Sequence, residues 1–429
     1  MATEVPTLDG SKKPSRSALS APGFLQLWLS GVCWHWARWG IAFLAAYQVN
    51  QVTDSPRLVQ LTGTTMWAPL LFGGAIGGVI ADRFDRARTV KVQLAVLVPM
   101  VALMGWLELS GRLEVWMMYP FLFFAGVGWV GDMTSRRSLV FDIVGQERID
   151  NAMALETVAL ASGVAAGNLL GGAIADALGV GEALLVVAGL LSVGLVLMST
   201  VPSAVLAVAS DARGALPSGS DRPGAIAELR EGLRLVRTNR GLRSILGITI
   251  LANFFFFAYF PAVQRIGARL DASPSQIGLL ASMTGFGMMA GSLTMAWRQP
   301  YRRGRAYVGG VILGMVMLIP FAAANSLWLA SASLFVASFG AGLFGSTQST
   351  LVLTVASERM RGRAMGLLSM AIGALPIGTL VLGEIAEVVD TSAAVITMAL
   401  LGLGGMTTWL VTHGEVLNMN SVPPEGGSA

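Results

Sequence analysis

The chain has 429 residues, of which 54% are hydrophobic and only 13% are charged, and its formal net charge is +4. A water-soluble protein of this length needs more polar surface, so the composition excludes an ordinary soluble enzyme or binding domain. The single cysteine, Cys33, excludes an intramolecular disulfide, and the two histidines, His35 and His413, are too few and too far apart for a zinc site. We therefore expect neither a bound metal nor a cofactor.

Residues 1–21 are polar and lack the apolar core and cleavage site of a signal peptide, which predicts a disordered tail. The rest of the chain offers repeated apolar stretches of the length, about 20 residues, that one membrane-crossing helix needs. Twelve stretches meet this criterion: 24–48, 58–81, 90–109, 115–134, 152–177, 182–201, 244–264, 275–297, 307–324, 327–353, 364–387 and 392–412. The predicted fold class is an all-α integral membrane protein with twelve transmembrane helices.

The basic residues show which side of the membrane each loop faces. With the twelve spans above, 24 of the 29 lysines and arginines fall on one side, and the other side holds only Arg57, Arg112, Arg265 and Arg269. Loops rich in Lys and Arg stay in the cytoplasm. This distribution predicts cytoplasmic termini in a bacterial inner membrane, and it explains the basic composition without a nucleic-acid partner.

The longest polar connection divides the twelve predicted spans into two sets of six. It separates an N-terminal bundle over 22–201 from a C-terminal bundle over 244–413, with a central loop over 202–243 and a cytoplasmic tail over 414–429. Within the loop, apolar residues recur at helical spacing from Ile226. We expect an amphipathic helix on the inner membrane surface there.

A cluster of charges follows the second span, in the stretch GVIADRFDRARTVK. Its Gly78, Asp82, Arg83, Arg86 and Arg88 resemble the signature loop of the major facilitator superfamily, whose twelve-span plan is similar to the one predicted here. The resemblance implies a conformational latch, with Asp82 facing the N-terminus of span eleven, where a helix favours a carboxylate. The alternative is that these charges only fix the topology.

Other segments resemble one branch of that superfamily, the enterobactin-exporter-like or transmembrane secretion effector group. The matching stretches are RSLVFDIVGQERIDNAMALE, LREGLRLVRTNRGLRSIL, ERMRGRAMGL and PIGTLVLGEIAE, which lie in both halves. Exporters of the superfamily often have Gly-Pro-x-x-Gly-Gly in span five, whereas this chain has Asn168 in place of the proline. Asparagine restores a backbone donor and removes a cause of kinking, which departs from the antiporter pattern.

Two basic side chains fall inside the first span. His35 and Arg38 lie roughly 16 and 21 Å along a helix that begins near Phe24, close to the middle of the hydrocarbon. Ionisable groups at that depth face a cavity or a partner, so we expect them to contact substrate or to take part in coupling. A structural ion pair is the alternative, and the flanking Trp34, Trp36 and Trp39 either stack on aromatic groups or simply pack against neighbours or lipid.

Asp132 in span four and Glu156 early in span five are the acidic residues best placed to carry a proton. Asn168 lies deeper in span five, where it either contacts substrate or hydrogen-bonds between helices. Burial of an acid favours its protonated form until water or a cation reaches it, which is the property that proton coupling needs.

No phosphate-binding loop of the Gly-x-x-x-x-Gly-Lys type occurs, so the sequence predicts a secondary transporter and not a pump or an enzyme. The leading prediction is a monomeric, proton-coupled exporter of a siderophore-like or amphipathic drug-like molecule, with membrane lipid around it. Two alternatives stay open: uptake of a small organic anion, and a transporter-like sensor or scaffold without transport activity.

Overall fold

The computed structural model describes residues 17–72, 85–202, 234–298, 301–357 and 360–419. Within those ranges the chain is helical and contains no strand. The segment with Gly78, Asp82 and Arg83, and most of the amphipathic helix predicted from Ile226, lie outside the described residues.

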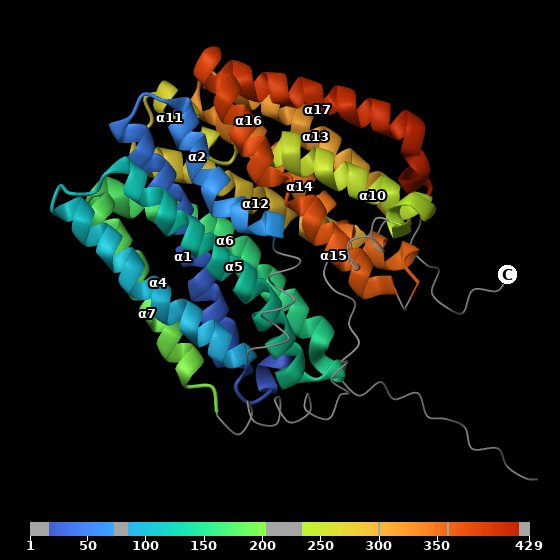
Figure 1. Ribbon diagram of the computed structural model, residues 1–429, viewed down its shortest axis with the longest axis horizontal. Coiled ribbons are helices and arrows are strands. Elements are labelled where there is room, and N and C mark those ends of the chain that lie inside the picture. Colours follow the sequence, from blue (N-terminus) through green and yellow to red (C-terminus); the bar gives the residue numbers. More distant parts are fainter. Residues whose placement is uncertain (1–16, 73–84, 203–233, 299–300, 358–359, 420–429) are drawn as a thin grey trace, which may run out of the picture.

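The first group of helices comes from the N-terminal part of the chain (Figure 1). Its members are η1 (Ala18–Ser20), α1 (Phe24–Val52), α2 (Pro56–Trp67), η2 (Ala68–Phe72), α4 (Arg86–Leu109), α5 (Val115–Val144), η3 (Gln146–Arg148), α6 (Ile149–Ala177) and α7 (Val180–Ser199). Capping side chains mark the starts of two helices. Ser55, which precedes Pro56 at the start of α2, accepts a hydrogen bond from the Leu58 amide, and Asp85 at the start of α4 accepts one from the Arg88 amide. Such side chains satisfy amides that have no partner within the helix.

The second group follows residue 234. It contains α10 (Arg240–Leu251), η4 (Ala252–Phe256), η5 (Phe257–Tyr259), α11 (Ala262–Arg269), α12 (Pro274–Arg298), α13 (Arg303–Ala323), α14 (Leu327–Val355), α15 (Arg361–Ile372), α16 (Leu375–Val388), α17 (Thr391–His413) and η7 (Gly414–Asn418). Between α10 and α11 the helix changes to a π turn and then a 3-10 turn. Pro261 explains the break, because its ring would clash with a carbonyl one turn earlier in a regular helix.

Nine helical stretches among the described residues are long and apolar enough to cross a membrane. They are 86–109, 151–177, 180–199, 240–269, 274–298, 303–323, 327–355, 361–388 and 391–418, which fall on nine of the predicted spans. Helices α1 and α5 cover the stretches predicted as spans one and four, and α2 covers the first part of span two, whose residues 73–81 lie outside the described ranges. The multi-pass helical architecture is confirmed, and the number twelve stays a prediction.

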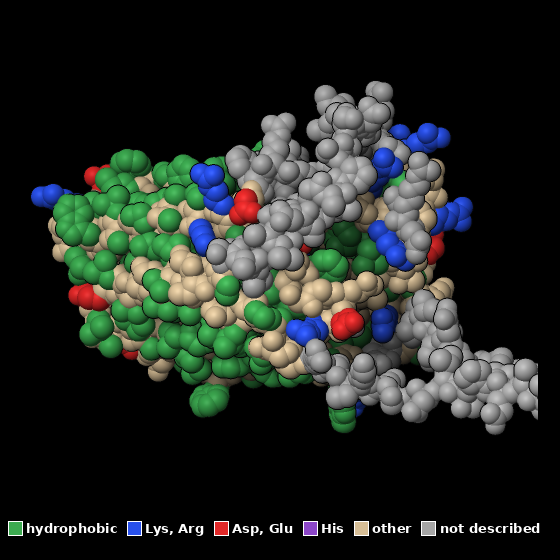
Figure 2. All heavy atoms as spheres, turned by 90° about the horizontal axis from the view of Figure 1, so that it is seen from below, with side chains coloured by type: hydrophobic (Ala, Val, Ile, Leu, Met, Phe, Trp, Pro, Cys, Tyr) green, Lys and Arg blue, Asp and Glu red, His purple; other side chains and the backbone are tan. Residues whose placement is uncertain are grey.

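The surface agrees with a membrane environment. Figure 2 shows a broad hydrophobic and uncharged area along the sides of the helices. Many large apolar side chains of the described residues are exposed, including Trp328 at 87% and Trp297 at 85% exposure. In water such exposure would be costly, whereas lipid tails cover it at no penalty.

Two helix pairs make the most extensive contacts between the groups: α6 packs against α12, and α2 packs against α16. Glycine allows the closest approach. A Cβ atom on Gly278 of α12 would lie 2.8 Å from the Asn168 carbonyl oxygen and 2.9 Å from the Gly172 Cα atom, both on α6. The two helices therefore touch through their backbones, as small residues allow in membrane proteins.

Polar contacts between the groups gather at the end of the molecule where α1 ends and α2 begins. Arg57 of α2 forms an ion pair with Glu384 of α16, at 2.9 Å. Glu387, one turn further, accepts hydrogen bonds from the Ser55 hydroxyl at 2.7 Å and the Arg57 amide at 3.0 Å. The described helices are thus fastened together at this end, which the basic residues predict to be the outer one.

Candidate functional site

Three of the predicted site residues line one cavity of about 90 Å³ within the N-terminal group. His35 reaches it from α1, Asp132 from α5 and Glu156 from α6, although they are far apart in the sequence. All three residues are more than nine-tenths buried. Their convergence agrees with the expectation that ionisable residues inside a span face a cavity or each other.

Asp132 has a partner that lies beyond the stretch 115–134 predicted as span four. Arg136, one turn after Asp132 on α5, donates from Nε to Asp132 Oδ1 at 2.8 Å. Its Nη1 donates to the Leu27 carbonyl on α1 at 3.0 Å, and the residue is only 1% exposed. The pair fixes Asp132 and ties α5 to α1, so Asp132 faces the cavity with its charge already balanced.

Glu156 and His35, unlike Asp132, have side-chain atoms without a hydrogen-bond partner among the described residues. The Glu156 Oε1 atom and the His35 Nδ1 atom are buried and have no hydrogen-bond partner among the described residues. Buried polar groups are normally satisfied, and an exception needs a bound water, an ion or a functional reason. Glu156 is therefore the carboxylate in this cavity that is free to change partners.

Arg38 lies next to the cavity and is held by aromatic rings. Its guanidinium carbon is 4.4 Å from the ring centroid of Trp129, 4.9 Å from that of Trp39 and 5.4 Å from that of Trp67. Cations bind the faces of tryptophan rings at such distances. Arg38 is 1% exposed, so this aromatic box encloses a full positive charge deep in the helix bundle.

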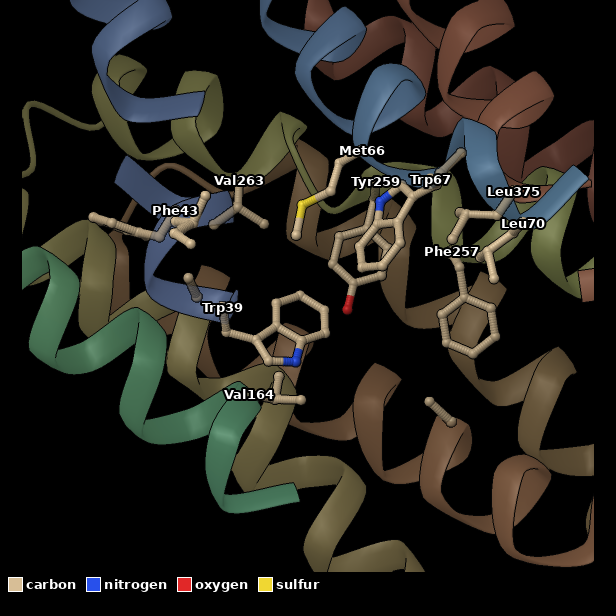
Figure 3. Packing of buried hydrophobic residues seen from close by; sticks show 14 of the residues in the cluster. Trp39, Phe43, Met66, Trp67, Leu70, Val164, Phe257, Tyr259, Val263 and Leu375 are labelled. Carbon is tan, nitrogen blue, oxygen red and sulfur yellow. The ribbon is translucent and has the colours of Figure 1, made fainter. Parts of the chain in front are cut away.

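Asn168 does not join this cluster. Its Nδ2 donates to the Val164 carbonyl of its own helix at 2.7 Å, and the side chain lines a second cavity of about 40 Å³ where the two helix groups meet. Trp39, Trp67 and Phe260 also line that cavity, and Figure 3 shows Trp39 and Trp67 among the buried side chains there. Arg38 thus lies between two cavities, because Trp39 and Trp67 border one and Trp129 borders the other.

Of the predicted latch residues, only Arg86 and Arg88 are described. Arg86 Nη1 forms an ion pair with Asp142 Oδ2 near the C-terminus of α5, at 2.7 Å. Arg88 contributes its backbone amide to the N-terminal cap of α4, which Asp85 provides. Arg86 thus links the start of α4 to α5, whereas the Arg88 contact lies within the cap of α4 itself. A conformational role for both residues stays a prediction.

Arg136 was not predicted as a site residue because span four was expected to end at residue 134, whereas α5 continues to Val144. A usable signal was present: Asp132 and Arg136 carry opposite charges four residues apart, which places them on one face of a helix.

In the described part of the chain, no three His, Cys, Asp or Glu side chains gather in a way that could hold a metal ion.

Comparison with known proteins fits this architecture. A family model described as transmembrane secretion effector matches residues 14–423. A comparison with curated proteins gives no significant match.

Solved transporter structures share the fold. A bacterial homologue of the human lysosomal transporter Spinster, in an inward-facing and unoccupied conformation, has 16% identity and a TM-score of 0.62, covering 92% of this chain and 95% of that one. The peptide transporter POT in complex with sulfate has 15% identity and a TM-score of 0.68, covering 96% and 100%. A D-xylose–proton symporter has 16% identity and a TM-score of 0.68, covering 93% and 99%.

These identities are low, so the solved structures bear on the fold and not on the substrate. The family model covers nearly the whole chain and includes both helix groups. Proteins of this family and fold carry molecules across membranes and are not enzymes. The chain is a multi-pass membrane transporter that belongs to the transmembrane secretion effector family of the major facilitator type.

Proposed function

We propose that this transporter exports a siderophore-like or amphipathic drug-like molecule from the cytoplasm in exchange for protons, by alternating access. The observation that carries the proposal is the buried cavity in which Glu156 and His35 have unsatisfied polar atoms beside the neutralised Asp132–Arg136 pair. An acid in such a place holds a proton until access changes. The family description, which speaks of secretion, supports the outward direction.

The contacts at one end of the molecule support the same cycle. With the topology predicted from the basic residues, the fastened end faces outward, which supports a state that is closed toward the outside. The protein would act as a monomer in the inner membrane of a bacterium, with both termini in the cytoplasm and the apolar sides in lipid. Asn168 in the second cavity, and the latch residues around Arg86, would respond to the movement between the helix groups.

Proton flux in everted membrane vesicles tests the proposal. We expect a panel of catecholate siderophores and amphipathic drugs to contain compounds that release protons from an energised vesicle, followed with a pH-sensitive dye. Glu156→Gln keeps the size of the side chain but cannot ionise, and it is expected to abolish this release. Glu114→Gln, at an exposed position outside the cavity, is the matched control and should behave as wild type. Release that persists in Glu156→Gln would remove Glu156 from the coupling path.

The fastened outer end allows a second test. In the double variant, Glu384→Gln removes the ion pair between Glu384 and Arg57. Glu387→Gln weakens the hydrogen bond that the residue at position 387 accepts from the Arg57 amide. Exposed pairs contribute about 0.2–1 kcal/mol each, so we expect a shift toward an outward-open state of up to about fivefold per pair. Spin labels at Val52 and Val389, one in each helix group, would report the change as an increased population of long distances. An unchanged distance distribution would show that these contacts do not hold the end closed.

Uptake of a small organic anion is the second candidate, and the enclosed positive charge of Arg38 favours it. Intact cells distinguish the two directions. Export lowers the cellular content of a substrate relative to cells without the transporter, whereas uptake raises it.

A further inference from the structure

The environment of Arg38 is unusual for a buried cation. No carboxylate of the described residues lies within ion-pair distance of it, and its Nε and Nη1 atoms are buried without a hydrogen-bond partner in that part of the chain. The nearest acidic residue of the cavity wall, Asp132, is already engaged by Arg136. The guanidinium is therefore held in place by ring faces while its hydrogen-bonding edge is left unsatisfied.

The charges around the larger cavity leave Arg38 without a close partner. Asp132 in the cavity wall is paired with Arg136, and Arg137, which also lines the cavity, is exposed. Arg38 adjoins this cavity through Trp129 and has no carboxylate of the described residues at ion-pair distance. Buried charges are normally paired, so Arg38 is a buried cation whose partner is missing from its immediate surroundings.

We propose that Arg38 and its aromatic box, formed by Trp39, Trp67 and Trp129, recognise a substrate that is an aromatic organic anion and exclude cationic substrates. The inference rests on the proposed transport of small amphipathic molecules and names their charge class. A guanidinium binds the two oxygens of a carboxylate or a catecholate through its planar fork, and the tryptophans offer surfaces for an aromatic body. A cation would otherwise be the natural guest of such a box, but Arg38 already occupies it.

The membrane potential fits this charge class. An inside-negative potential favours the outward movement of an anion, so the same charge that Arg38 recognises would assist export. Cationic drugs, which the potential draws inward, are the compounds that the resident guanidinium would repel.

Binding of three small aromatic probes tests the inference without any gradient. Benzoate, benzyl alcohol and benzyltrimethylammonium share an aromatic body and differ in charge. For the purified full-length protein in detergent, calorimetry should show benzoate binding at least about tenfold more tightly than the alcohol, because a charge-assisted hydrogen bond is lost with the neutral probe. The ammonium probe should bind more weakly than the alcohol.

Variants of Arg38 supply the decisive contrast. Arg38→Met keeps much of the side-chain volume and removes the positive charge from the aromatic box. The order of the three affinities should therefore reverse, and the ammonium probe should bind most tightly. Arg38→Lys keeps the charge without the planar fork and should still prefer benzoate, though less strongly. Arg112→Met, at an exposed loop position, is the matched control and should keep the wild-type order.

Three results would overturn the inference: a wild-type protein that binds the ammonium probe as tightly as benzoate, an Arg38→Met variant that keeps the preference for benzoate, or an Arg38→Lys variant that prefers the ammonium probe. If Arg38→Met does not fold, the wild-type series and Arg38→Lys decide the question. Because binding needs neither protons nor direction, a protein that prefers benzoate but shows no coupled flux in vesicles would contradict the proposed function alone.

Discussion

Replacement of Arg136 by methionine is expected to destabilise the protein by about 3–5 kcal/mol, the range found when one partner of a buried ion pair is removed. Asp132 would be left buried at 2% exposure without its counter-charge, and the Leu27 carbonyl would lose a donor from Arg136. Thermal unfolding of the detergent-solubilised protein should therefore move to a markedly lower temperature. The matched control is Arg57→Met, because the ion pair of Arg57 is about half exposed and contributes only about 0–1 kcal/mol.

The double variant Asp132→Leu with Arg136→Met separates stability from function. Replacing both members of a buried pair by apolar residues of similar size is often neutral for stability or better, so the unfolding temperature should recover most of the loss. Substrate-dependent proton flux should stay impaired if Asp132 takes part in coupling, as proposed. Full flux in a stable double variant would leave the pair a purely structural role, and a stable single Arg136→Met variant would contradict the buried ion pair itself.

The membrane architecture was predictable from the sequence because length and hydrophobicity alone decide whether a helix can span the bilayer. Nine predicted spans correspond to described helices of sufficient length and apolar character. The ends of the helices were less predictable, and α5 shows why. The charged Arg136 and Arg137 are typical of a loop, yet α5 continues through them because Asp132 and the Leu27 carbonyl satisfy Arg136.

The side chains that would form the site were partly predictable. His35 and Arg38 were identified by their depth in an apolar span, and Asp132 and Glu156 by their acidity. That Trp67 and Trp129 meet around Arg38 could not be predicted, since α1, α2 and α5 come together only in the folded bundle. A helix that is apolar on all sides carries no periodic signal for the face that it turns toward its neighbours.

A second large effect is expected at the crossing of α6 and α12, where Gly285→Leu should block transport while leaving the protein folded. A Cβ atom on Gly285 would lie 2.3 Å from the Ala165 backbone nitrogen and 2.7 Å from its Cα atom, so the backbones have to separate. Each helix keeps its contacts within its own group, α6 with α1 and α12 with α14, which explains why the fold should survive.

Overpacking of this kind costs about 1–3 kcal/mol, enough to shift an equilibrium between two conformations by about 5- to 150-fold. Because α6 and α12 touch where the helix groups join, the cost falls on states in which the groups are close. Distances between spin labels at Val52 and Val389 should therefore lengthen in Gly285→Leu. In Gly309→Leu they should not, since a Cβ atom at Gly309 meets nothing within 4 Å. A Gly285→Leu protein with wild-type distances and flux would show that the two helix groups do not need this close crossing. The movement of one group against the other would then pivot at another contact between them, such as that of α2 with α16.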